Sequence, residues 1–241
     1  MVEMRKTPEE LLTALEQRYP APSADRDPRI LSDEEIASGA GMILARSHRP
    51  LEDLALYYIL FATGARPLEV ARLEVRDYLD PTGSVRRLSY MRRDVAINGR
   101  PRPLCFSSSR LNGAMDAYLA ERALCTAGLG SRDLWRRLDP QSRLFLSSSG
   151  RGFEIVQYGE NGQRRFLCRA IQETYRKVFR YAGLKGVTAL TVRHTFVDRL
   201  YARGADESQV GLLLGISERN VVHQRFPHRL PPLKELTKEL V

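Results

Sequence analysis

The stretch from residue 190 to residue 226 most strongly limits what this chain can fold into. Its apolar residues recur at helical spacing, and two glycines, Gly204 and Gly215, interrupt the pattern. Glycine favours the left-handed backbone conformation that ends a helix. We therefore expect three consecutive helices here. The first carries Arg193, the second covers about 206–214, and the third follows the second glycine.

The charge balance of the chain points to an acidic partner. The 241 residues carry 38 Lys+Arg against 29 Asp+Glu, a formal net charge of +9. Most of the cations are arginines, whose planar guanidinium pairs bidentately with phosphate. A genome rich in G and C would explain arginine over lysine, but it would not explain the positive excess. The composition therefore favours a polyanion such as nucleic acid.

Several function classes find little support in the sequence. No apolar run approaches the roughly 18 residues that a membrane-spanning helix needs, and the three cysteines lack metal-ligand spacing. We therefore expect no metal, no cofactor, no small-molecule substrate and no membrane partner, in a cytoplasmic protein associated with the nucleoid.

The chain divides into three segments. Residues 1–30 read as a leader helix and linker, 31–228 as one domain, and 229–241 as a tail helix with a leucine stripe. Ser32 and Glu35 have the spacing of a capping box at the start of a helix.

The middle of the domain changes from helical to alternating spacing. Short alternating runs cover 84–90, 92–97 and 102–106, and the Asn98–Gly99 pair between the last two is a hairpin signal. Helical spacing returns at 111–126 and 165–182, with a polar loop between them. We therefore expect a mainly α fold with a small antiparallel β-sheet of two or three strands (α+β).

Two separated motifs carry a family likeness. The segment ATGARPLEVARLEVRDY at 62–78 resembles the first signature of the tyrosine recombinases (phage integrases), and TVRHTFVDRLYARGADESQVGLLLGIS at 191–217 resembles the second. The segments at 166–189 and LSDEEI at 31–36 are also similar to family segments. The likeness covers roughly 31–228 and implies an integrase-like catalytic-domain fold. The leader is too short to supply the family's N-terminal domain, so we expect half a DNA clamp, or a partner that completes it.

The resemblance also implies which reaction residues are present. In that family a tyrosine attacks a DNA phosphodiester, two arginines stabilise the phosphate, and a lysine and two further groups, usually histidines, assist. The arginine positions match Arg66 and Arg193. The other four positions carry residues that cannot perform the chemistry: Ile97 for the lysine, Leu190 and Ile216 for the histidines, and Phe226 for the tyrosine. The resemblance thus implies a pseudoenzyme with no intact catalytic set.

We therefore expect a protein that binds double-stranded DNA without cleaving it. It would be an accessory factor or regulator in recombination, integration or mobile-element biology. An active recombinase or another protomer, reached through the tail, is the expected protein partner. The expected phosphate-binding residues are Arg66, Arg193, His194, Arg100, Arg102, Arg92, Arg93 and Lys177.

Two other functions are compatible with the same residues. Residues 217–226 could be the recognition helix of a helix-turn-helix transcription regulator, in which Ile216 packs the turn. Alternatively, the chain could be a protein-interaction scaffold that uses the fold without binding DNA. The recombinase likeness explains more of the chain, because it also accounts for 62–78 and the hairpin.

Overall fold

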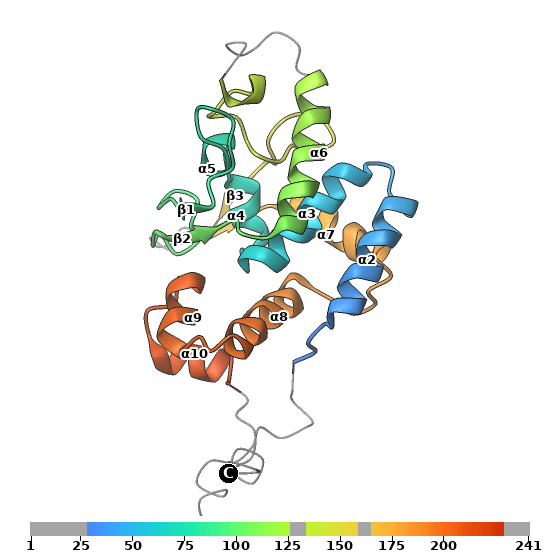
Figure 1. The fold of residues 1–241 in the computed structure, drawn as a ribbon. Helices are drawn as coiled ribbons and strands as arrows, with labels where there is room; N and C mark the ends of the chain where they lie inside the picture. Colours follow the sequence, from blue (N-terminus) through green and yellow to red (C-terminus); the bar gives the residue numbers. More distant parts are fainter. Residues whose placement is uncertain (1–27, 126–133, 159–164, 229–241) are drawn as a thin grey trace, which may run out of the picture.

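The computed structural model describes residues 28–125, 134–158 and 165–228 (Figure 1). The leader helix expected before residue 28 and the tail helix expected at 229–241 lie outside these residues. The helices are α2 (Asp33–Arg46), α3 (Pro50–Thr63), α4 (Pro67–Arg72), α5 (Val75–Tyr78), α6 (Ser109–Cys125), α7 (Arg169–Tyr181), α8 (Ala189–Ala202), α9 (Glu207–Leu214) and α10 (Arg219–Arg225), with a 3-10 turn η2 (Trp135–Arg137). The strands are β1 (Leu88–Met91), β2 (Arg102–Cys105), β3 (Val156–Tyr158) and β4 (Arg165–Leu167).

The prediction of a mainly helical fold with a small antiparallel sheet is confirmed, since the strands form two two-stranded antiparallel sheets. Helix α3 lies at the centre and contacts α2, α6, α7 and α8. Nearly every side of α3 is apolar, so a helix with this sequence is stable only when other helices cover it. The largest buried cluster of apolar side chains forms around it.

Helices α8, α9 and α10 form a second layer below the main body in Figure 1. This arrangement confirms the three helices predicted for 190–226. Both predicted glycine breaks adopt positive φ, 84° at Gly204 and 69° at Gly215. The layer has a small apolar cluster of its own, to which Val210, Val222 and Phe226 contribute.

The predicted capping box at the start of α2 is present. The Glu35 N–H donates to Ser32 Oγ at 3.2 Å, and the Ser32 N–H donates to Glu35 Oε2 at 3.0 Å. At the C-terminal end of the central helix α3, Gly64 forms the cap with a φ of 59°. The chain turns there into α4, and the turn places Arg66 next to α8.

The predicted strand at 92–97 is wrong. The hairpin pairs Leu88 with Cys105 and Met91 with Arg102, so residues 92–101 form the connection instead of a strand. Within this connection the N–H groups of Val95 and Ala96 both donate to the Arg92 carbonyl, as in a helical turn. The two residues are consecutive and both buried, so the segment lacks the alternation of a half-exposed strand.

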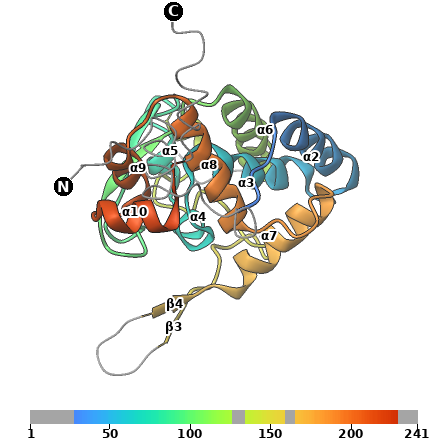
Figure 2. The same cartoon turned by 90° about the horizontal axis from the view of Figure 1, so that it is seen from below.

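The β3–β4 hairpin is a second departure from the sequence prediction. It projects from the body beside α7 (Figure 2), and it pairs Val156 with Leu167 and Tyr158 with Arg165. We predicted a loop for the first of these strands and the beginning of a helix for the second. Helix α7 begins only at Arg169, because residues 165–167 pair with a strand that local helical spacing does not reveal.

Candidate nucleic-acid interface

A cavity of about 540 Å³ lies where the turn between α3 and α4 meets α8 and the end of α10. It collects five of the positions that the family resemblance singled out, although they are up to 160 residues apart in the chain. The lining residues are Ala65, Arg66, Pro67, Ala189, Leu190, Arg193, His194, Ile216, Arg225 and Phe226. Three predicted phosphate ligands, Arg66, Arg193 and His194, and three positions without reactive groups therefore share one site.

Arg66 is the N-terminal cap residue of α4, and its side chain lines the cavity. Its backbone is extended, and Pro67 follows at the first position of the helix, where the missing N–H costs nothing. The Arg66 N–H donates to Glu69 Oε2 at 2.8 Å. Its guanidinium is partly exposed and makes no hydrogen bond or ion pair within the part of the chain that the structure describes. It is available to a ligand.

Arg193 is a buried cation, with 5% of its surface exposed. Its guanidinium donates to the Gly64 carbonyl at 2.6 Å and to the Leu214 carbonyl at 2.9 Å, so it joins the α3 cap to the end of α9. Burial, together with the nearby charges of Arg66, lowers the pKa of Arg193 to about 9. The group is still charged at neutral pH, in surroundings that favour an added anion.

The negative charge of Glu69 acts on Arg193, and Glu69 itself forms an ion pair with Arg102. The Arg102 guanidinium donates to Glu69 Oε1 at 2.9 Å and to Oε2 at 2.6 Å, and both side chains are at most 3% exposed. The sequence predicted that Arg102 binds phosphate directly, but in the structure its donors face a buried carboxylate.

Phe226, which the resemblance assigns to the nucleophile's position, lies at the end of α10. Its ring is 4% exposed and its centroid lies 4.8 Å from that of His194. The Arg193 guanidinium lies over the same ring at 5.9 Å. The Tyr201 hydroxyl donates to the Phe226 carbonyl at 3.1 Å. The ring next to the arginines thus carries no oxygen that could attack a phosphate.

The hairpin residues are distributed differently from our prediction. Arg92 contacts three carboxylates: Asp77 at 2.8 Å, Glu74 at 2.9 Å and Asp94 at 2.7 Å. The sequence predicted that Arg92 binds phosphate, but in the structure its guanidinium is paired with these carboxylates. The remaining members of this group are exposed: Arg93, Ile97 and Arg100, the last of which bonds to Ser217 Oγ.

Lys177 does not belong to this site. It lies on α7 and lines a separate cavity of about 360 Å³ with Glu52 and Asp53. The structure instead places Arg225 at the cavity lined by Arg66 and Arg193, where its charge contributes to lowering the pKa of Arg193. The sequence offered one signal for Arg225, its position directly before Phe226.

No group of three or more His, Cys, Asp or Glu side chains among the described residues is placed to hold a metal ion. None of the described helices is both long and apolar enough to cross a lipid bilayer.

Known proteins resemble this chain in structure but not detectably in sequence. No family model matches the chain, and no curated protein matches it. XerA recombinase superposes with a TM-score of 0.60 at 19% identity, over 94% of this chain and 73% of XerA. The post-cleavage complex of the XerH site-specific recombinase with palindromic difH substrate gives a TM-score of 0.58 at 20% identity, over 90% of this chain and 55% of XerH.

A third similar structure is the Tn1549 transposon integrase in complex with circular intermediate DNA. It gives a TM-score of 0.55 at 14% identity, over 96% of this chain and 75% of the solved integrase fragment. The chain thus spans between about half and three quarters of the proteins that it resembles. The predicted integrase-like architecture is confirmed: this chain has the fold of the tyrosine recombinases.

Proposed function

We propose that this protein binds double-stranded DNA through the cavity at Arg66 and Arg193 and does not cleave it. One observation carries the proposal. Among the residues that the structure describes, Arg193 is buried without a carboxylate hydrogen bond and Arg66, which lines the same cavity, has no ion pair; both are near Phe226, which the resemblance assigns to the nucleophile's position. A phosphate would balance the positive charge of this cavity, whereas the phenylalanine ring has no hydroxyl that could attack the phosphate.

The neighbours support the same substrate. XerH and the Tn1549 integrase were solved with DNA, and the +9 net charge suits a polyanion. We infer a role as an accessory factor or regulator in recombination, integration or mobile-element biology, in the cytoplasm at the nucleoid. An active recombinase or a second protomer, contacted through residues 229–241, is the protein partner that we propose.

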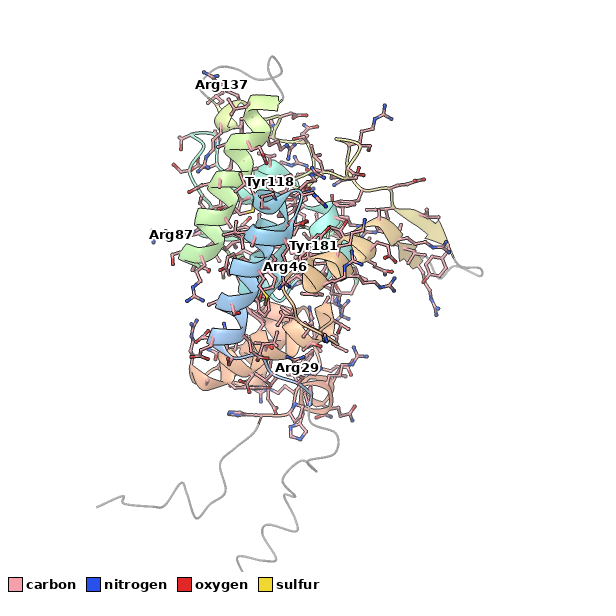
Figure 3. All side chains as sticks on the ribbon, turned by 90° about the vertical axis from the view of Figure 1, so that its right-hand side faces the viewer. Arg29, Arg46, Arg87, Tyr118, Arg137 and Tyr181 are labelled. Carbon is pink, nitrogen blue, oxygen red and sulfur yellow. The ribbon has the colours of Figure 1, made fainter. Side chains whose placement is uncertain are left out.

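Binding is tested by the salt dependence of duplex affinity. A phosphate contact contributes about 0.9 to the slope of log K against log salt. Arg66→Ala should lower low-salt affinity about tenfold and reduce the slope by about one contact. Arg137→Ala is the matched control, because this exposed arginine lies at the far end of the body, near α6 (Figure 3). Equal effects of the two variants would remove the cavity from the binding surface.

The absence of cleavage is tested with nicked suicide duplexes, which trap a covalent protein–DNA adduct. We expect no adduct with the natural chain. We also expect none with Phe226→Tyr, because Leu190 and Ile216 still line the cavity and Ile97 still occupies the hairpin. A trapped adduct with the natural chain would overturn the pseudoenzyme proposal.

The helix-turn-helix alternative has one specific observation in its favour. Asn220 and Gln224 are exposed and four residues apart on α10, so they lie on the same side of that helix. Two of its other polar side chains are committed to α9, since Arg219 bonds to Ser208 and His223 to Glu207.

Base recognition by α10 would show as a loss of sequence preference in an Asn220→Ala/Gln224→Ala variant at an unchanged salt slope. The scaffold alternative predicts something different for the natural chain. It would bind no duplex at low salt.

A further inference from the structure

The carboxylate of Glu69 is held by four hydrogen bonds that converge from three segments. Arg102 donates to both of its oxygens, at 2.9 and 2.6 Å. The Arg66 N–H donates to Oε2 at 2.8 Å, and the Ile97 N–H donates to Oε1 at 3.4 Å. With these donors the buried carboxylate has no need of another cation.

Glu69 nevertheless lies close enough to compete for the phosphate site. Its pKa is raised by burial, but the hydrogen bonds and charge of Arg102, together with the N–H and charge of Arg66, bring it below the ordinary value. The charge of Glu69 also acts on Arg193. If Glu69 lost Arg102, the guanidinium groups that still interact with its charge would be those of Arg66, Arg193 and Arg72.

Arg102 itself is fixed in place by the contact between the hairpin and the layer formed by α8, α9 and α10. Asn98 Nδ2 donates to the Gly215 carbonyl at 2.6 Å, across 117 positions of sequence. Gly215 also approaches Arg102 so closely that an added Cβ would lie 3.2 Å from Arg102 Cδ. The Arg102 side chain is thus confined beside Glu69 and does not line the phosphate cavity.

We propose that Arg102 is a positioning residue for the phosphate site: by neutralising Glu69 it leaves the guanidinium of Arg66 free for a DNA phosphate. The inference rests on the proposed DNA-binding function. It assigns to the hairpin arginine an indirect role that replaces the direct phosphate contact expected from the sequence.

A double-mutant cycle tests the proposal. Arg102→Met keeps most of the aliphatic stem and removes the charge, so Glu69 should turn to the arginines of the cavity. We expect low-salt duplex affinity to fall about tenfold and the salt slope to fall by about one phosphate contact. Adding Glu69→Gln removes the competing charge while its amide oxygen still accepts from the Arg66 N–H. The double variant should recover affinity to within about twofold of the natural chain.

Recovery distinguishes a charge effect from simple distortion of the hairpin. If the double variant binds as weakly as Arg102→Met, the loss comes from misfolding of the site and the proposal is overturned. The single variant Glu69→Gln provides a second measurement, which does not require the Arg102→Met variant to fold. It should bind at least as tightly as the natural chain, and a loss as large as that of Arg66→Ala would also overturn the proposal.

Arg122→Met is the control for removing a buried arginine. Arg122 is 8% exposed and donates to the carbonyls of Arg143 and Leu144, far from the cavity. Its loss should lower stability without changing the salt slope.

Failure of the Arg102 proposal can be distinguished from failure of the proposed DNA-binding function. If the natural chain shows no salt-dependent binding, DNA binding itself fails. If it binds and Arg66→Ala weakens it but the cycle shows no recovery, only the role of Arg102 fails.

Discussion

Glu52 gives the structure a pH-dependent stability that can be measured. This residue lies in the first turn of α3 and is 3% exposed. Its Oε2 contacts Arg49 at 2.6 Å, while Oε1 is buried and has no hydrogen-bond partner among the described residues. Burial raises the pKa of Glu52 to about 7, and Arg49 opposes this only in part. The Arg49 side chain is 49% exposed, so water screens its charge.

The direction of the effect follows from where the proton binds more tightly. The folded chain holds a proton on Glu52 up to a pKa of about 7, whereas an ordinary glutamate releases it near 4.5. Between these two values the folded state binds more protons than the unfolded state, so the free energy of unfolding falls as pH rises. At about 1.4 kcal/mol per pH unit, the loss amounts to about 3 kcal/mol and is complete above pH 7.

Glu52→Gln removes this titration while preserving the shape of the side chain. Urea unfolding of the variant and the natural chain between pH 4.5 and 8 should give a stability difference that shifts by about 3 kcal/mol in favour of the variant. The exposed Glu173→Gln on α7 serves as the control and should show a much smaller change. A difference between Glu52→Gln and the natural chain that does not vary with pH would refute the reasoning.

Three further perturbations test separate parts of the fold. Gly64→Ala should lower the free energy of unfolding in urea by about 1–3 kcal/mol, because φ is 59° and the new Cβ would lie 2.5 Å from Phe196. The control Gly113→Ala has open space around the new Cβ and should not lower it. Tyr201→Phe should cost about 1 kcal/mol, since it removes the hydrogen bond to the Phe226 carbonyl; a calorimetric Tm equal to that of the natural chain would contradict this. Inorganic sulfate should raise the Tm of the natural chain but much less that of Arg193→Met, because the anion relieves the repulsion among the cavity arginines; equal shifts would mean that sulfate acts elsewhere.

Local signals in the sequence were sufficient where a few neighbouring residues decide the structure. The capping box of α2 depends on two side chains three residues apart, and the ends of α8 and α9 depend on single glycines. Helix α3 is apolar on nearly every side, which already requires central burial. The resemblance to the tyrosine recombinases singled out Arg66, Arg193, Leu190, Ile216 and Phe226, and the structure places all five around one cavity.

The strands were harder to predict, because each depends on a partner that local spacing does not reveal. Residues 165–167 continue a helical pattern in the sequence, yet they pair with 156–158. Residues 92–97 alternate in sequence, yet the carboxylates of Asp77 and Glu74 hold Arg92 while the backbone turns. In both segments a contact outside the segment outweighs the local preference.

The sequence by itself determined the helical framework and the positive charge, because both are properties of residue types and their spacing, and the family resemblance added a phenylalanine where a tyrosine is expected. Only the tertiary structure decided which arginines are paired with carboxylates. Arg102 and Arg92 carry the same charge as Arg66, but folding pairs the first two with carboxylates, whereas the Arg66 guanidinium makes no ion pair with any of the described residues. The charge of each arginine follows from its residue type, whereas the neutralisation of that charge depends on which groups the fold brings within hydrogen-bond distance.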